Sequence, residues 1–252
     1  MIDANDLISK LRENLEPLPY IYAFWLEGSY AAGTADEYSD IDFWIDFGDE
    51  HEEKAIEAVE NILAELAEID YKYITPQHPH PQIRQRTYHL AGTSEYFAID
   101  FCWQLHSRDE YAFYENDTVE SIKVIFDKNN VIKYKPLVLS DFAQQNKARL
   151  DKAKYRREQY SRVEKYVRRG QYLEAYAYYG HYVLEPLIEL IRLIYTPAYM
   201  DYHLIHISLH IPENECKKLE YFAQAGSLDD IAEKIPQAGK WFDELVGLIE
   251  GK

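Results

Sequence analysis

The spacing of hydrophobic residues predicts two parts with different architecture. In the first 140 residues, short apolar runs rich in aromatic and β-branched residues alternate with amphipathic stretches, a pattern typical of strands and helices. Helical spacing covers residues 3–15 and 52–69. Strands are expected at residues 19–28, 39–47, 71–75, 84–92, 95–104 and 124–132, with a hairpin turn at Thr93-Ser94.

From residue 141 onward the pattern is helical. One long helix is expected over residues 141–170, ending at Gly170, and a second over 171–195, where Pro186 favours a kink. Three shorter or later helices are expected at residues 201–210, after Pro212 and after the cap Ser227. The sequence therefore predicts an α+β protein, with a small mixed sheet in a catalytic domain of residues 1–140 and an all-α helical bundle of residues 141–252.

The strand SDIDFWIDF, residues 39–47, alternates strictly between two kinds of side chain. One face holds Ile41, Phe43, Ile45 and Phe47, and the other holds Asp40, Asp42, Trp44 and Asp46. Two carboxylates roughly 7 Å apart along one strand face can flank divalent cations. Ten residues earlier, a Gly-Ser pair follows an aromatic strand, where glycine lets backbone N–H groups approach a phosphate closely.

A third carboxylate lies in another predicted strand, EYFAIDFCWQ. Its alternation places Phe101 and its apolar partners on one face and leaves Asp100 on the other. A carboxylate at the centre of a strand is costly unless it is paired or liganded. For Asp100 alone a structural salt bridge is as good an explanation as catalysis, but with the upstream aspartate pair the functional interpretation is favoured.

The combination Gly28-Ser29, Asp40-Ile41-Asp42 and Asp100 resembles the nucleotidyltransferase superfamily of the DNA polymerase β type. The resemblance covers roughly residues 20–130, and the helical second half looks most like the aminoglycoside and lincosamide nucleotidyltransferases. No GxxxxGK[ST] motif is present, so the sequence does not predict a P-loop enzyme.

The resemblance implies a reaction and a role for each motif residue. A hydroxyl of an acceptor would attack the α-phosphorus of ATP and release pyrophosphate, with two Mg²⁺ ions as cofactors. The implied metal ligands are Asp40, Asp42 and Asp100, of which Asp100 is also a candidate to take the acceptor's proton. The implied nucleotide-binding residues are Gly28, Ser29 and Ser39.

A polar stripe in the helical half adds a further candidate. Glu174, Tyr178, His181, Glu185 and Glu189 recur every three or four residues on an otherwise apolar helix. Glu185 is our candidate catalytic residue from this half, since it or His181 could bind a cationic acceptor or act as the base. The alternative is a solvent-facing stripe with an ordinary His–Glu pair.

Charge and composition narrow the class of partner. The formal net charge is −17, with 27 acidic against 11 basic residues up to residue 140 and 17 against 16 thereafter. This acidity argues against nucleic acid and suits a metal ion or a cationic acceptor, although solubility is the better explanation of the net charge alone. Residues 147–169 hold ten basic against three acidic residues, which could meet phosphates or form a solvated face.

The expected protein is a cytoplasmic small-molecule adenylyltransferase, and an aminoglycoside-type antibiotic is one candidate acceptor. No apolar run approaches the roughly 20 residues of a membrane span, and two cysteines are too few for a disulfide framework. Its partners would be a nucleoside triphosphate and a small hydroxylated acceptor. Two other functions stay open, namely transfer to a protein or RNA acceptor and a non-catalytic nucleotide-binding or antitoxin-like module; a homodimer is also left open.

Overall fold

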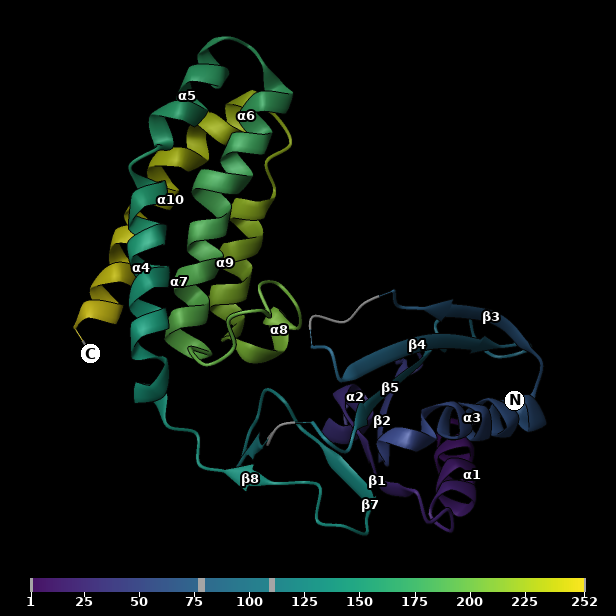
Figure 1. The fold of residues 1–252 in the computed structure, drawn as a ribbon. Helices are drawn as coiled ribbons and strands as arrows, with labels where there is room; N and C mark the ends of the chain where they lie inside the picture. The colour runs from purple at the N-terminus through teal and green to yellow at the C-terminus, as the bar shows by residue number, and fades with distance from the viewer. Residues whose placement is uncertain (1, 77–79, 109–111, 252) are drawn as a thin grey trace. The chain divides into compact units, whose positions relative to one another are not determined.

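The chain divides into two compact units, residues 1–137 and 138–252 (Figure 1). The computed structural model describes residues 2–76, 80–108 and 112–251. The first unit combines a mixed sheet with helices and the second is helical, so the predicted α+β class is confirmed. The functional division into a catalytic domain of residues 1–140 and a helical domain of residues 141–252 stays a prediction.

A six-stranded mixed sheet forms the centre of the first unit. The strand order is β3-β4-β5-β2-β1-β7; the central pair β2 and β5 is parallel and the other neighbours are antiparallel. The strands are β1 (Ile21–Leu26), β2 (Ile41–Phe47), β3 (Ile69–Ile74), β4 (Ile83–Leu90), β5 (Ile99–Leu105) and β7 (Lys123–Asp127). Two short strands, β6 (Phe113–Tyr114) and β8 (Tyr134–Lys135), form a separate parallel pair.

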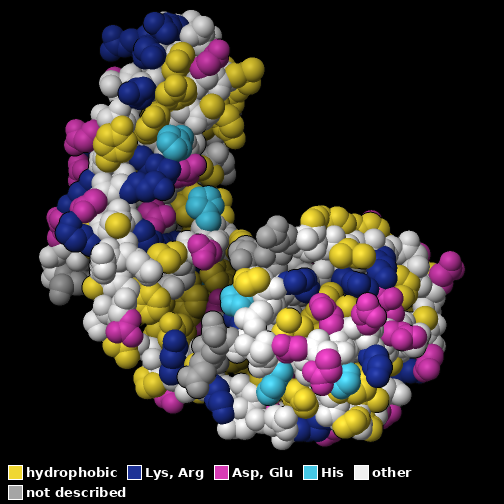
Figure 2. Space-filling model, in the orientation of Figure 1, with side chains coloured by type: hydrophobic (Ala, Val, Ile, Leu, Met, Phe, Trp, Pro, Cys, Tyr) yellow, Lys and Arg dark blue, Asp and Glu magenta, His cyan; other side chains and the backbone are white. Residues whose placement is uncertain are grey.

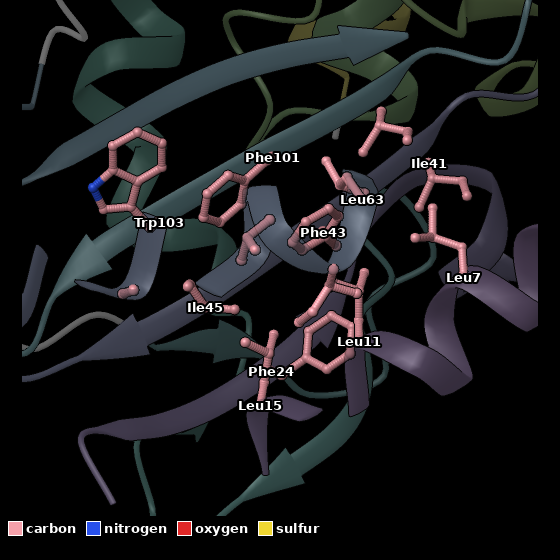
Figure 3. Close-up of a cluster of buried hydrophobic side chains, with 14 of the residues drawn as sticks. Leu7, Leu11, Leu15, Phe24, Ile41, Phe43, Ile45, Leu63, Phe101 and Trp103 are labelled. Atoms are coloured by element: carbon pink, nitrogen blue, oxygen red, sulfur yellow. The ribbon is translucent and has the colours of Figure 1, made fainter. Parts of the chain in front are cut away.

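The apolar face of the sheet packs against helices α1 (Ala4–Leu15) and α3 (Glu52–Leu66). Asp3 caps α1 as its side chain accepts a hydrogen bond from the N–H of Asn5. The core combines one stripe of each helix with alternate residues of the strands (Figure 3). Its fully buried members include Leu7, Leu11, Leu15, Phe24, Ile41, Phe43, Ile45, Leu63 and Phe101.

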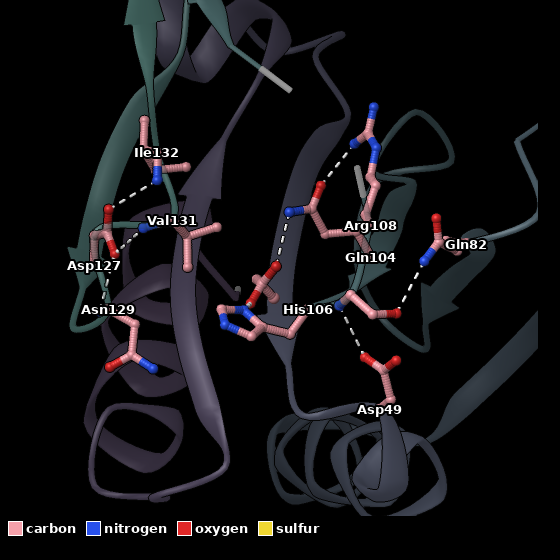
Figure 4. Close-up of polar contacts among 11 residues, drawn as sticks. Asp49, Gln82, Gln104, His106, Arg108, Asp127, Asn129, Val131 and Ile132 are labelled. Carbon is pink, nitrogen blue, oxygen red and sulfur yellow. Dashed lines mark hydrogen bonds and ion pairs between the residues drawn. The ribbon is translucent and has the colours of Figure 1, made fainter. Parts of the chain in front are cut away.

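The opposite face of the sheet carries Asp42, Asp46 and Asp100 beside a small apolar cluster that includes Trp25. At one end, the short helix α2 (Gly28–Ala32) follows β1, and the 3-10 turn η1 (Asp49–His51) follows β2 at the other. Near η1, Asp46 is 1% exposed and accepts hydrogen bonds from Gln104 Nε2 and His106 Nδ1, each at 2.8 Å. Arg108 in turn donates to Gln104 Oε1 at 2.6 Å (Figure 4). These contacts satisfy a buried carboxylate and hold the ends of β2 and β5 together.

Helices make up the second unit. They are the 3-10 turn η2 (Leu139–Phe142), α4 (Ala143–Arg157), α5 (Tyr160–Arg168), α6 (Tyr172–Tyr179), the π-turn η3 (Gly180–Leu184), α7 (Glu185–Tyr195), α8 (Ile207–His210), α9 (Glu213–Ala223) and α10 (Leu228–Glu250). They enclose a second hydrophobic core that includes Leu187, Ile191 and Trp241. Ser227 caps α10 as predicted, accepting from the N–H of Asp230 at 3.0 Å. Within the described ranges, no helix combines the length and apolar character that crossing a membrane requires.

Two features of the second unit differ from the single long helices expected there. The predicted helix over 141–170 breaks between α4 and α5, because the last turn of α4 tightens and Gln159 N–H bonds to Arg156 O at 3.0 Å. The break turns Tyr160 into the core. In the second helix, the irregularity predicted near Pro186 is the π-turn η3, which directly precedes α7. Proline has no N–H to donate to the preceding turn, so the regular α-helical hydrogen bonds are interrupted there.

Candidate active site

The turn between β1 and α2 brings the backbone against the acidic residues. Gly28 adopts a left-handed conformation with φ of +61°. A Cβ added there would lie 2.3 Å from Asp42 Oδ2, so a side chain at this position clashes with the carboxylate. Glycine is therefore required for two reasons, the backbone conformation and the close approach.

Three aspartates from neighbouring strands meet beside this turn. Asp42 on β2 lies directly beside Asp100 on β5 in the parallel register, and Asp40 immediately precedes β2. One carboxylate oxygen of each residue lies within 4.8 Å of the others. Thr87 of β4 donates to Asp100 Oδ1 at 2.6 Å and orients that carboxylate. The structure thus brings together the three carboxylates that the sequence singled out.

The electrostatics of this cluster favour a bound cation. Burial, followed by the negative charges of Asp40, Asp100 and Glu27, raises the pKa of Asp42 to about 7. Three carboxylates this close repel one another unless a positive charge lies between them. Their oxygens are the hard ligands that Mg²⁺ prefers, so the donor set fits a divalent metal.

The two serines predicted to bind nucleotide have different surroundings. Ser29 Oγ is buried and has no hydrogen-bond partner among the residues that the structure describes. A buried hydroxyl without a partner is costly, and its place in the turn after β1 fits a phosphate oxygen. Ser39 Oγ instead donates to Asp36 Oδ1 at 3.0 Å and accepts from Asp36 N–H at 2.9 Å. Those contacts shape the loop before β2, and a nucleotide-binding role for Ser39 stays a prediction.

Glu185 belongs to the second unit, at the start of α7 after the π-turn. Its Oε2 accepts from Arg156 at 2.6 Å and lies 3.3 Å from His181 Nδ1. His181 and Glu185 line a cavity of about 250 Å³ together with Tyr176 and Tyr179. The predicted His–Glu pair is therefore present, with an arginine added that the sequence pattern did not reveal. The catalytic role of Glu185 stays a prediction.

Half of the basic residues in segment 147–169 form ion pairs inside the helical unit. Five of its ten basic residues pair with carboxylates there, and Arg156–Glu185 is one of these pairs. The others are Lys147–Asp151, Arg149–Glu189, Lys154–Glu250 and Arg157–Asp243. Dark blue side chains on the helical unit in Figure 2 lie among magenta ones, as these pairs require. These contacts favour the structural interpretation of the segment over a phosphate-binding one.

The family model for a nucleotidyltransferase domain matches residues 8–138, more than half of the chain. The chain therefore belongs to the nucleotidyltransferase domain family, and the site is that of a nucleotidyltransferase with a cluster of three carboxylates. No curated protein matches the chain. Among solved structures, it is similar to an aminoglycoside 6-adenyltransferase from Bacillus subtilis. The identity is 11% over 98% of this chain and 92% of that chain, and the TM-score of 0.33 is too low to carry an argument.

The structure adds residues to the site that sequence reasoning missed. Glu27 lies next to Asp42, and its side chain accepts a hydrogen bond from Trp25 Nε1 at 3.0 Å. Glu27 lies two residues after Trp25, and side chains two residues apart point to the same face of a strand. This spacing could have placed Glu27 on the face of the sheet that carries Asp42. Tyr38 and Tyr96 form an exposed edge-to-face pair, 5.2 Å between ring centroids, in the loops that lead into β2 and β5. No pattern distinguished these two among the 23 tyrosines.

Proposed function

We propose that this nucleotidyltransferase transfers an AMP group from ATP to a hydroxyl of a small acceptor and releases pyrophosphate. The observation that carries the proposal is the meeting of Asp40, Asp42 and Asp100 beside a Gly-Ser turn whose serine hydroxyl lacks a partner. Carboxylates suited to a divalent cation and a turn suited to phosphate are what this transfer requires.

In the proposed reaction, the oxygen of the acceptor hydroxyl forms a bond to the α-phosphorus while the bond between that phosphorus and the bridging oxygen breaks. Asp40, Asp42 and Asp100 would hold Mg²⁺, which supplies positive charge to the phosphates and activates the attacking oxygen when bound. Gly28 and Ser29 would hold the phosphates that leave as pyrophosphate. Asp100 is positioned by Thr87, and we propose it as the group that takes the acceptor's proton.

We propose a cationic, polyhydroxylated acceptor of the aminoglycoside type. The acidity of the first 140 residues supports this class, because a field of one sign draws in a ligand of the opposite sign. Antibiotic inactivation in the reducing cytoplasm is the biological role that we infer from this acceptor class.

The test is pyrophosphate release from Mg-ATP with a panel of aminoglycosides, lincosamides and neutral polyols, followed by mass spectrometry of the acceptor. We expect release with one cationic compound and the added mass of AMP on it. Asp42→Asn, which keeps the shape but removes the charge, should abolish both signals. Running the panel with GTP and CTP tests the nucleotide. Glu185→Gln tests the alternative base: a loss of transfer in this variant would assign the acceptor's proton to Glu185 instead of Asp100.

Each alternative function predicts a different result. Silence with every small molecule, together with ATP binding, would point to a protein or RNA acceptor, which the same assay detects by transfer of labelled AMP to macromolecules. Binding of Mg-ATP that Asp42→Asn leaves intact, with no transfer to any acceptor, would indicate a non-catalytic module.

A further inference from the structure

A fourth carboxylate lies beside the three aspartates of the site. Glu27 follows the last residue of β1, and its N–H donates to the carbonyl oxygen of Asp42 at 3.0 Å. Since Leu26 pairs with Phe43 in the antiparallel register, Glu27 lies across from Asp42 where the two strands separate. Two carboxylates directly across from each other destabilise a sheet unless a positive charge compensates them.

Neutral groups, rather than cations, hold the Glu27 side chain in place. Its carboxylate accepts a hydrogen bond from Trp25 Nε1 at 3.0 Å. The indole of Trp44, which stacks on that of Trp25 with centroids 5.7 Å apart, also lowers the pKa of Glu27. Burial raises the pKa of Glu27 to about 6 in spite of these contacts. Glu120 also raises that pKa, and Arg108 is the weakest of the groups that lower it.

Among the residues that the structure describes, no side chain of full opposite charge forms an ion pair with Glu27, so a negative charge is kept next to the cluster. Indole N–H groups fix the direction of the carboxylate and leave its charge in place. In a partly buried site that charge acts over several ångströms, because the effective dielectric constant is well below that of water. A cation among the aspartates is the compensation that the geometry offers.

We propose that Glu27 is a fourth acidic residue of the metal site. Its negative charge raises the affinity of the site for divalent cations, and Glu27 is not itself a ligand. The inference rests on the metal site of the proposed function and deepens it. The indole contacts explain why Glu27 is a positioning residue for the cation: the carboxylate is fixed beside the ligands instead of joining them.

The experiment measures binding of Mn²⁺ to the full chain by electron paramagnetic resonance, without nucleotide or acceptor. Glu27→Gln keeps the shape and an oxygen that accepts from the indoles, and it should weaken Mn²⁺ binding about five- to thirty-fold. Glu27→Asp keeps the charge and shortens the reach, so it should retain most of the affinity. Glu53→Gln, an exposed residue on α3 against the other face of the sheet, should bind as the wild type does.

Circular dichroism of each variant confirms that it folds. Unchanged Mn²⁺ affinity in Glu27→Gln would overturn the proposal, and so would a loss in Glu27→Asp as large as that in Glu27→Gln, because hydrogen-bond geometry would then matter instead of charge. If the wild type binds no Mn²⁺ and Asp42→Asn makes no difference, it is the metal site of the proposed function that fails. The two failures are therefore distinguishable.

Discussion

Two glycines near the candidate site share a backbone conformation but differ in what surrounds them. Gly28 and Gly33 have φ of +61° and +73°. A Cβ at Gly28 would meet Asp42, whereas a Cβ at Gly33 would have no atom within 4 Å. This pair separates the cost of the left-handed backbone from the cost of crowding the carboxylate.

We expect Gly28→Ala to abolish Mn²⁺ binding and pyrophosphate release, because its methyl group displaces the Asp42 carboxylate. Gly33→Ala should keep both. Each variant should lose about 1–2 kcal/mol of free energy of unfolding from backbone strain. Urea unfolding and Mn²⁺ titration measure the two effects separately. Equal metal binding by the two variants would contradict the role assigned to the close approach.

The unpartnered Ser29 hydroxyl predicts opposite effects on stability and binding. Ser29→Ala removes a buried polar atom without a partner, so the free energy of unfolding should stay the same or rise. Affinity for Mg-ATP should fall about tenfold if the hydroxyl binds a phosphate. Calorimetric titration of each protein with Mg-ATP measures the change in affinity.

Ser39→Ala is the matched control for Ser29→Ala. Its hydroxyl bonds to Asp36, so its loss should cost about 1 kcal/mol of stability. A drop in ATP affinity in Ser39→Ala as well would support the nucleotide role predicted for that residue. A drop in Ser39→Ala alone would contradict the role assigned to Ser29.

At the scale of elements, β2 carries aspartates with two different functions on one face. Asp42 lies among like charges at one end, and Asp46 at the other end is buried between Gln104 and His106. Alternation along the strand predicts the shared face. It does not distinguish the two roles, because the partners come from β5 and the loop after it.

Substitutions at these two positions should have opposite consequences. Asp46→Ala leaves the buried Gln104 amide without this acceptor and should lower the free energy of unfolding by about 1–3 kcal/mol, with little change in Mn²⁺ affinity. Asp42→Asn should abolish Mn²⁺ binding without destabilising the metal-free fold, since it relieves repulsion. Urea unfolding in EDTA compares the free energies of unfolding of the two metal-free variants. A metal-binding defect in a folded Asp46→Ala protein would refute this division.

The edge strand β3 is attached to β4 by a pH-dependent contact. His89 Nδ1 lies 2.7 Å from Asp70 Oδ1, and this bond, with a second to the carbonyl of Ser94, raises the pKa of His89. Because the folded pKa lies above the unfolded one, the contribution is fully present below about pH 6.5 and is lost as pH rises through the folded value.

We therefore expect His89→Gln to lower the free energy of unfolding more at about pH 5.5 than at about pH 8.5, by less than about 1 kcal/mol for a partly exposed pair. Urea unfolding at both pH values measures the difference. Asp70→Asn should show the same pH dependence. A larger effect at the higher pH would reverse the sign and exclude the ion pair as the cause.

At the scale of the whole molecule, each unit has its own hydrophobic core. Phe43 and Phe101 belong to the core of the first unit, and Leu187 and Trp241 to that of the second. A separate core is the condition for independent folding. The helical unit also satisfies many of its basic residues internally.

We expect a fragment of residues 138–252 to fold alone, with helical circular dichroism and a cooperative thermal transition. In the full chain, Mn²⁺ should raise the unfolding temperature of the first unit and leave that of the second unchanged, because binding stabilises the part that binds. Pulse proteolysis with mass spectrometry distinguishes the two units. An unfolded fragment would show that the second core depends on the first unit.

Much of the fold follows from periodicity. The strict alternation of residues 39–47 predicted the buried face of β2, and the helical spacing of 52–69 predicted α3. The helical half was less well predicted, since the break before Tyr160 and the π-turn before Pro186 depend on how the helices pack around their core. Local spacing has no access to that packing.

The sequence by itself determined the class of the site, because a Gly-Ser turn and the aspartates Asp40, Asp42 and Asp100 are spaced for a nucleotidyltransferase. The tertiary structure decided which oxygens meet, since the β2–β5 register places Asp42 beside Asp100. It also decided that Glu27 lies beside the cluster and that Arg156 pairs with Glu185. The reason is physical. The spacing of residues along one strand determines which side chains face the site, whereas the burial and pKa of each side chain depend on neighbours from other elements.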